Sequence, residues 1–223
     1  VGFSQLMLRH YNNPDKVRNY AEKIVVSSQH LLSLINDVLD MSKIESGKTT
    51  LNLCDVNLAD IINETDNIIR PQAKKKNQTF VVKSDGVEYC CITADKLRLS
   101  QILINILSNA VKYTEEGGNI TFEIKEIKVT NPQIVKYKFI ISDNGIGMSE
   151  EYLKDIFKPF TREETSLTDA VQGTGLGMAI TKNLINLMGG TIKVLSTQGM
   201  GTTYEVTMEF RIADINTNKD LWN

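Results

Sequence analysis

The sequence predicts an α+β protein in which a helical hairpin precedes a two-layer α/β sandwich, with one sheet and its helices on a single face. Two observations carry this prediction. Apolar residues recur at helical spacing through the first 46 residues. From residue 49 onward, alternating apolar segments are mixed irregularly with helical ones, which is typical of α+β folds. We therefore expect a helical domain at 1–48, a sandwich at 49–211 and a polar tail or linker at 212–223.

The helical part is expected to contain two helices. Residues 1–11 fit the end of one helix, which an Asn-Asn-Pro-Asp turn at 12–15 interrupts. The second helix is predicted from about Pro14 to Ser46, and Gly47 would end it. Because its apolar stripe is longer than a lone hairpin can bury on itself, we expect it to meet a second hairpin in a dimeric four-helix bundle.

The first half of the sandwich is expected to contain short strands and two helices. Strands are predicted near 49–53, 79–83 and 89–92. Asn57 is suited to cap a helix that continues through Ile69. Asp95 or Thr93 is suited to cap a longer helix that ends at Tyr113.

The second half repeats this mixture of elements. Strands are predicted around 120–129, 134–142, 191–196 and 203–211. Helices are predicted at 149–158 and 176–188, the latter ending at a pair of glycines. The polar segment 161–173 between them is a candidate lid over a site.

Composition argues against nucleic-acid binding, a cysteine metal site and a disulfide framework. The 25 basic and 27 acidic residues give a net charge of −2, so nucleic acid is not expected as a partner. The only basic run, at 74–76, is interpreted as the solvated end of a helix. Cys54, Cys90 and Cys91 lack the spacing of metal ligands, and their odd number argues against a disulfide framework.

Two asparagines and a lysine share one face of the helix that ends at Tyr113. Asn105 and Asn109 are four residues apart, and Lys112 follows almost one turn later. Amides on an apolar helix are costly to bury without partners, so two satisfied core asparagines are the structural alternative. We predict instead that an amide oxygen binds Mg²⁺ between phosphates while Lys112 contacts a phosphate. Tyr113 would lie against an adenine or a ribose.

A second motif, Asp143-Asn144-Gly145-Ile146-Gly147, follows an apolar strand. An aspartate at a strand end, beside glycines that let a ligand approach the backbone, is suited to accept a hydrogen bond from an exocyclic amino group. An ordinary Asp-Asn-Gly turn is the alternative for this motif taken alone.

A third motif opens the helix predicted at 176–188. It consists of Gly173, Thr174, Gly175, Leu176 and Gly177. Glycines there expose backbone N–H groups and place a phosphate at the positive end of the helix. The motif is not a P-loop, because no Lys-Ser/Thr follows the glycines. It is not a dinucleotide fingerprint either, because Met178 takes the sixth position and a polar loop precedes it.

Two further features complete the predicted site. Arg162 in the lid segment is placed to reach a γ-phosphate, with a solvated charge as the alternative. A glycine-rich turn at 199–202, which includes Thr202, forms the fourth motif. Each motif is weak alone, but the four in this order predict one nucleotide site.

In this order the four motifs, with Phe157-Lys158-Pro159-Phe160 between the second and third, resemble the N, G1, F, G2 and G3 boxes of sensor histidine kinases. The resemblance covers about residues 1–210, and 30–45 is similar to the second helix of that family's dimerisation and phosphoacceptor domain. It implies a sandwich of the histidine-kinase, chaperone and topoisomerase ATPase type. Such a domain uses ATP and Mg²⁺ to phosphorylate a histidine, which passes the phosphoryl group to an aspartate of a response regulator.

The resemblance also implies roles for the residues that match. It makes Asn109 the Mg²⁺ ligand with Asn105 as its partner, Lys112 and Arg162 phosphate contacts, Tyr113 a nucleoside contact and Asp143 the adenine reader. It further implies a homodimer through the hairpin, a response-regulator receiver domain as partner, and a cytoplasmic domain of a protein attached to a bacterial inner membrane. Features around the third motif are similar to members that carry receiver domains of their own.

One departure concerns the phosphoacceptor. In the family this is a histidine followed by an acidic residue and a basic-Thr-Pro run, on the first helix. His10 and His30 are the only histidines, and neither fits. We expect the acceptor a short way before Val1, so that the chain is a kinase core that begins just after its phosphorylation site.

Two alternatives remain within this resemblance. Hydrolytic ATPases of the superfamily carry a glutamate four residues before the metal-binding asparagine, whereas Asn105 occupies that position here. Asparagine cannot act as a base, so we expect poor hydrolysis. A degenerate kinase that only binds a partner is the other alternative, against which the intact motifs argue.

Overall fold

The computed structural model describes residues 2–47, 49–84, 86–163 and 174–213. The chain divides into two compact units, 1–48 and 49–223. None of the helices in these ranges combines the length and the apolar composition that a bilayer crossing needs.

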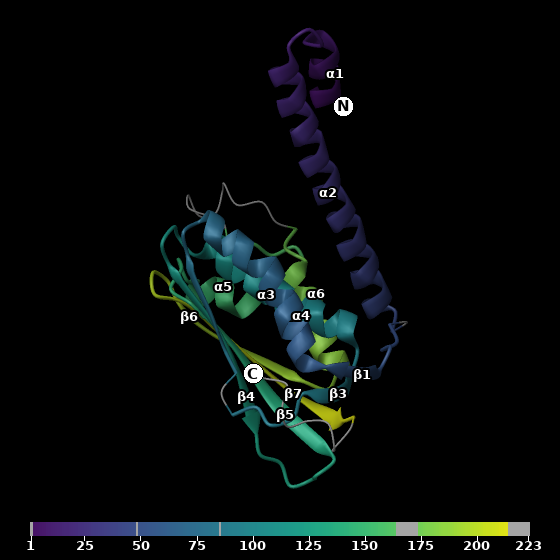
Figure 1. Cartoon of the computed structure of the whole chain (residues 1–223), viewed down its shortest axis with the longest axis vertical. Coiled ribbons are helices and arrows are strands. Elements are labelled where there is room, and N and C mark those ends of the chain that lie inside the picture. The colour runs from purple at the N-terminus through teal and green to yellow at the C-terminus, as the bar shows by residue number, and fades with distance from the viewer. Residues whose placement is uncertain (1, 48, 85, 164–173, 214–223) are drawn as a thin grey trace. The chain divides into compact units, whose positions relative to one another are not determined.

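The N-terminal unit is a pair of helices, α1 (Gly2–Arg9) and α2 (Pro14–Glu45), as the sequence predicts (Figure 1). Aromatic contacts join them: the rings of Phe3 and Tyr20 stack with centroids 6.3 Å apart, and the His10 ring lies 5.9 Å from that of Tyr20. The short α1 can cover only the first part of the long α2.

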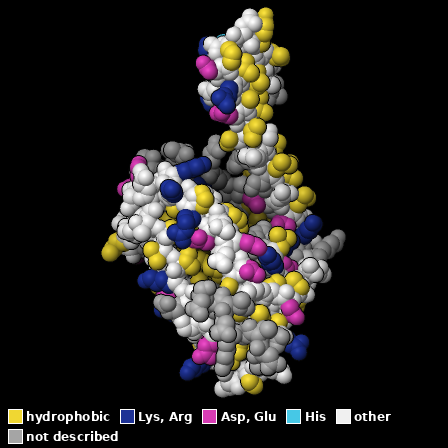
Figure 2. Space-filling view, in the orientation of Figure 1, with side chains coloured by type: hydrophobic (Ala, Val, Ile, Leu, Met, Phe, Trp, Pro, Cys, Tyr) yellow, Lys and Arg dark blue, Asp and Glu magenta, His cyan; other side chains and the backbone are white. Residues whose placement is uncertain are grey.

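The remainder of α2 exposes an apolar face. Its exposed large apolar residues are Val25, Val26, Leu31, Leu32, Ile35, Val38 and Leu39. Figure 2 shows hydrophobic side chains running along this unit. A stripe of this length at near-heptad spacing is typical of a helix that packs against other helices.

The second unit contains seven strands and four helices among its described residues. The strands are β1 (Cys54–Asn57), β2 (Thr79–Lys83), β3 (Cys91–Ala94), β4 (Asn119–Ile127), β5 (Ile134–Asp143), β6 (Thr191–Thr197) and β7 (Gly201–Ile212). The helices are α3 (Leu58–Lys75), α4 (Lys96–Tyr113), α5 (Glu150–Asp155) and α6 (Gly177–Leu187). The sheet order is β1-β3-β7-β5-β4-β2, with β6 also beside β7, and only the β2–β4 pair is parallel.

The core lies between one face of this sheet and the helices α3, α4 and α6 (Figure 1). Every second residue of β5 is buried, as in a strand with one covered face. Phe139 on β5 lies between Ile124 on β4 and Val206 on β7, and all three are fully buried. From α4 the same core receives Ile102, Leu103, Ile106 and Leu107. The predicted α+β sandwich is confirmed.

Two strand predictions are wrong in position. No strand forms at 49–53: β1 follows at Cys54–Asn57, and β3 lies at Cys91–Ala94 rather than at 89–92. The two strands pair with each other in antiparallel register, so their partner decides which residues form them. The backbone N–H of Asn52 instead donates to the Asp95 carboxylate at 2.9 Å.

The predicted helix caps are present. Asn57 accepts a hydrogen bond from the Ala59 N–H at 2.8 Å, and α3 begins directly after it. Asp95, rather than Thr93, caps α4 by accepting from the Arg98 N–H at 3.0 Å. Asp95 thereby fixes the start of the helix that carries the first motif.

Candidate functional site

The four predicted motifs meet within the second unit, where backbone hydrogen bonds connect them. The Tyr113 carbonyl at the end of α4 accepts from the Ile146 N–H at 3.1 Å, and the Ile146 carbonyl accepts from the Gly199 N–H at 2.7 Å. The loop after β5 is therefore held between the end of α4 and the β6–β7 turn. The start of α6 joins them through Asn105.

Asn105 ties α4 to α6. Its amide nitrogen donates to the Thr181 hydroxyl at 3.2 Å and to the Gly177 carbonyl at 3.4 Å. Thr181 is fully buried, so this contact lies inside the protein. The amide of Asn105 therefore fixes the first turn of α6 relative to α4. Sequence reasoning missed Thr181, because it lies 76 residues away.

Asn109 lies one turn further along α4 and is half-buried. Its side chain makes no hydrogen bond to another residue that the structure describes. A half-buried amide without a protein partner is suited to a ligand or a cation, because polar groups shielded from water need partners.

Lys112 and Tyr113 lie against each other at the end of α4. The Lys112 ammonium is 4.9 Å from the centre of the Tyr113 ring. Burial lowers the pKa of Lys112, and the charge of Arg162 lowers it further. Burial also raises the pKa of Tyr113. The two cations, with Arg162 exposed, thus gather near one aromatic ring, which suits a polyanionic ligand.

Asp143 ends β5 and has one carboxylate oxygen engaged. Its Oδ1 accepts from the N–H groups of Gly145 at 2.9 Å and Thr202 at 3.3 Å. Its Oδ2 has no hydrogen-bond partner among the described residues. Burial raises the pKa of Asp143, and the two backbone hydrogen bonds oppose that shift. The carboxylate is held rigidly, with one acceptor atom left for a ligand.

Two glycines of the second motif are required by the protein's own packing. A Cβ at Gly145 would lie 2.4 Å from the Tyr113 carbonyl oxygen. Gly147 has φ +63, and a Cβ there would lie 2.0 Å from the Thr197 carbonyl oxygen. Close approach to neighbouring loops therefore explains both glycines, in addition to the predicted approach of a ligand.

The third motif leaves the start of α6 open. Leu176, at the N-cap, makes no side-chain capping hydrogen bond, and a Cβ at Gly177 would meet open space. The Thr174 hydroxyl accepts from the Leu176 N–H at 3.0 Å, and the Gly175 carbonyl accepts from the Phe160 N–H at 3.0 Å. Gly173 lies outside the described residues. Among the described residues, nothing lies against a Cβ placed at Gly177, so the positive end of α6, which no side chain caps, is suited to an anion.

Thr202 acts mainly through its backbone, which donates to Asp143. Its buried hydroxyl lies 2.9 Å from that of Ser196. The Ser196 hydroxyl also accepts from the Met148 N–H at 3.0 Å, so it joins the turn to the second motif. Ser196 was missed from the sequence, because a single serine in a strand carries no pattern.

Two further tyrosines were missed as well, Tyr204, which is buried, and Tyr152, which is half-buried. Burial raises the pKa of Tyr204, and Asp143 raises it further. Burial likewise raises the pKa of Tyr152, to about 12, with Tyr113 as a second cause.

The described residues contain no group of three or more His, Cys, Asp or Glu side chains that could hold a metal ion. The Asn109 amide oxygen suits Mg²⁺ that arrives with phosphates and water, because Mg²⁺ takes oxygen ligands and needs few from the protein.

Two family models match the chain. The model described as histidine kinase-, DNA gyrase B- and HSP90-like ATPase matches residues 94–212, which is more than half of the chain. The model described as His Kinase A (phospho-acceptor) domain matches residues 1–47.

Curated relatives match along almost the whole chain. The Non-motile and phage-resistance protein of Caulobacter vibrioides is 35% identical over 98% of this chain and 26% of its own length. The autoinducer 2 sensor kinase/phosphatase LuxQ of Vibrio vulnificus is 34% identical over 93% of this chain and 24% of its own. The chain thus spans about a quarter of the length of these relatives.

Solved structures share the fold. The crystal structure of full-length ShkA in complex with AMPPNP matches with a TM-score of 0.71 and 29% identity, over 88% of this chain and 39% of that one.

Proposed function

The chain belongs to the histidine kinase-, DNA gyrase B- and HSP90-like ATPases and, with its phospho-acceptor domain, to the sensor histidine kinases. We propose that its second unit binds MgATP and transfers the γ-phosphate to a histidine. One observation carries the proposal. Asp143 Oδ2 and the Asn109 amide have no hydrogen-bond partner among the described residues, and they belong to motifs that backbone hydrogen bonds join. Asp143 Oδ2 is suited to accept a hydrogen bond from a base, and the Asn109 amide oxygen is suited to bind a cation.

Asp143 recognises the adenine. Its free Oδ2 accepts from the exocyclic amino group, while Oδ1 stays fixed by Gly145 and Thr202. A half-buried, rigid acceptor discriminates between amino and keto bases, because the wrong base leaves polar groups unpaired. Tyr113 contacts the nucleoside.

The phosphates lie between the end of α4 and the start of α6. Lys112 and Arg162 neutralise their charge, and the uncapped N–H groups of α6 donate to their oxygens. The Asn109 amide oxygen would hold Mg²⁺, which would supply further neutralisation of the phosphate charge. Asn105 holds the first turn of α6 relative to α4.

The acceptor histidine is supplied from outside these 223 residues. His10 lies in the helical hairpin, where its ring nitrogen is 3.0 Å from the Leu6 carbonyl and its ring contacts Tyr20. Neither His10 nor His30 has the acidic and basic-Thr-Pro neighbours of the family's acceptor. Phosphoryl transfer depends on positioning and charge neutralisation, so a properly presented imidazole suffices.

A labelling experiment tests the transfer. The chain with radiolabelled ATP and Mg²⁺ should show no phosphohistidine by itself. A chimaera whose α1 is replaced by the longer phosphoacceptor helix of a relative should gain an acid-labile label, and removing that helix's histidine should abolish it. A label on the unmodified chain that persists in a His10→Ala, His30→Ala variant would place the phosphate elsewhere and contradict the proposal.

We propose two partners for the helical unit. One is a second copy of the chain, which would cover the apolar face of α2. The other is the receiver domain of a response regulator, which takes the phosphoryl group from the histidine onto an aspartate.

A further inference from the structure

The ammonium of Lys76 lies at the C-terminal end of α4. It donates to three backbone carbonyls, those of Val111 at 3.0 Å, Lys112 at 2.9 Å and Thr114 at 2.9 Å. An ammonium has three hydrogens, so all of its donors are used. This corrects the interpretation of 74–76 as a solvated helix end: Lys74 and Lys75 are exposed, but Lys76 is half-buried and its Nζ is engaged.

Gln78, two residues along, contacts the same end of α4. Its side-chain amide nitrogen donates to the carbonyls of Val111 at 3.1 Å, Thr114 at 2.7 Å and Glu115 at 3.2 Å. Gln78 is buried, so these contacts are shielded from water. Together, Lys76 and Gln78 satisfy carbonyls that the end of a helix otherwise leaves without partners.

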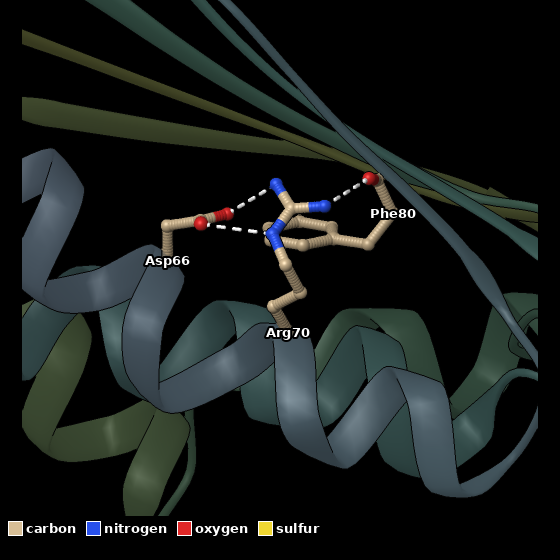
Figure 3. A network of polar contacts seen from close by, with 3 residues as sticks. All are labelled: Asp66, Arg70 and Phe80. Carbon is tan, nitrogen blue, oxygen red and sulfur yellow. Dashed lines mark hydrogen bonds and ion pairs between the residues drawn. The ribbon is translucent and has the colours of Figure 1, made fainter.

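The turn that carries Lys76 is itself fixed. At one side, the Asn77 amide donates to Glu116 at 2.6 Å, and the Lys76 carbonyl accepts from the Gly117 N–H at 3.0 Å. At the other side, Arg70 on α3 binds the Asp66 carboxylate with two hydrogen bonds (Figure 3). The same guanidinium donates to the Phe80 carbonyl on β2 at 3.3 Å and so joins the elements on both sides of the turn.

The carbonyls that Lys76 binds belong to the same turn as the two predicted ligand contacts, Lys112 and Tyr113. Lys112 and Tyr113 lie between the Val111 and Thr114 carbonyls that Lys76 binds. The Tyr113 carbonyl, which is not among the three that Lys76 binds, accepts from the Ile146 N–H. Two different segments of the chain therefore fix the last turn of α4.

We propose that Lys76 is a positioning residue for nucleotide binding, holding the last turn of α4 so that Lys112 and Tyr113 face the ligand. Lys76 contacts carbonyls and not the nucleotide, so it acts through those two side chains. The inference rests on the proposed function, because it assigns Lys112 and Tyr113 to ATP.

The test compares Lys76→Met with Lys75→Met, a neighbouring exposed lysine that serves as the matched control. MgATP affinity is measured by calorimetry at a temperature at which circular dichroism shows both proteins folded. We expect Lys76→Met to weaken binding about tenfold, since it removes three charge-assisted hydrogen bonds, and Lys75→Met to change it less than about twofold.

A double-mutant comparison separates positioning from a general loss of stability. In a Lys112→Met, Tyr113→Ala background, Lys76→Met should weaken binding by less than about twofold, because the groups through which it acts are gone. A general structural effect would instead keep the full tenfold loss. Hydrogen exchange at the Thr114 amide should become faster in Lys76→Met and stay unchanged in Lys75→Met.

The outcomes distinguish the two proposals. If the unmodified chain does not bind MgATP, the proposed function itself fails. If the unmodified chain binds MgATP, either of two results overturns only the positioning role of Lys76. One is a Lys76→Met variant that binds MgATP as tightly as Lys75→Met does. The other is a Lys76→Met substitution that still weakens binding tenfold in the Lys112→Met, Tyr113→Ala background. If Lys76→Met does not fold, Lys76→Gln is measured in the same way; if neither folds, Lys76 is a stability residue and the inference is wrong.

Discussion

The Asp143 carboxylate is partly desolvated, and the role that we propose for it is to accept a hydrogen bond from a ligand. Burial raises its pKa, and its Oδ2 has no partner among the residues that the structure describes. Such a group is costly to bury without a hydrogen bond, and shifted carboxylates concentrate at functional sites for this reason. A base that donates to Oδ2 offsets that cost.

We therefore predict opposite effects of Asp143→Asn on stability and binding. The melting temperature of the nucleotide-free protein should rise, because the buried charge is removed while the amide oxygen still accepts from Gly145 and Thr202. ATP affinity should fall at least about tenfold, because an amide N–H would face the amino group of adenine. Thermal unfolding and calorimetry measure the two effects, with exposed Asp60→Asn as control. A variant that binds ATP as the unmodified chain does would contradict this role.

The raised pKa of Asp143 also predicts a pH dependence. Because the pKa is higher in the folded than in the unfolded state, the contribution of Asp143 to stability is present below the unfolded value of 3.8 and is lost as pH rises through the folded value. ATP affinity should change in the opposite sense and fall as pH decreases through that folded value, because a protonated carboxyl accepts poorly.

Calorimetry and thermal unfolding from about pH 7 down to about pH 4 measure both trends. The Asp143→Asn variant corrects for protonation of ATP itself. If the ATP affinities of the variant and of the unmodified chain depend on pH in the same way, a group other than Asp143 titrates and the prediction is wrong.

Among the structural elements, the loop after β5 depends on glycine at 147. Gly147 has φ +63 and no room for a Cβ beside the Thr197 carbonyl, whereas Gly189 has φ +73 and open space around its Cβ position. The two positions differ in packing, but both have a positive φ that would strain a residue other than glycine.

We predict that Gly147→Ala lowers the free energy of unfolding clearly more than Gly189→Ala does. Gly189→Ala, the control, should lower the free energy of unfolding by about 1 kcal/mol from its positive φ alone. Gly147→Ala should lower it by about 1–3 kcal/mol more, because the loop must move. ATP affinity should fall only in Gly147→Ala. Urea unfolding and calorimetry measure the difference, and equal losses in both variants would refute the importance of this contact.

The helices and strands show which features of the fold the sequence could predict and which it could not. Helix ends were predicted to within a few residues where a local signal exists, such as Asn57 and Asp95 at the caps. The first and third strands were misplaced, because their residues depend on pairing with each other. The four motifs were recognisable because each is a local run of residues.

The supporting contacts of the site were not predictable from local runs. Thr181 is 76 residues from Asn105, and Ser196 is 48 residues from Met148. Lys76 was misinterpreted because its partners at the end of α4 lie 35 to 38 residues away. A side chain whose partner is distant in sequence carries no periodic or motif signal.

At the scale of the whole molecule, the exposed face of α2 predicts self-association. Among the α2 residues whose burial the structure describes, seven large apolar side chains are exposed, several at spacings of three, four and seven residues. Since α1 covers only the beginning of α2, a second copy is the expected cover.

We expect a weak, concentration-dependent dimer by light scattering. Leu31→Glu with Val38→Glu should give a monomer at all concentrations, because the charges would be buried in the seam, whereas exposed Asn36→Glu should leave the dimer intact. If the unmodified chain is monomeric throughout, or if all variants behave alike, this face does not mediate the dimer.

The most direct measurement is a calorimetric titration of the 223-residue chain with ATP, in the presence and in the absence of Mg²⁺. Binding to one site is predicted, and Asn109→Ala should weaken it at least about tenfold with Mg²⁺ but by less than about twofold without the ion. Asn186→Ala, an exposed amide on α6, should bind as the unmodified chain does under both conditions. A chain that takes up no ATP, or an Asn109→Ala variant whose affinity is unchanged in Mg²⁺, would contradict the assignment of this site.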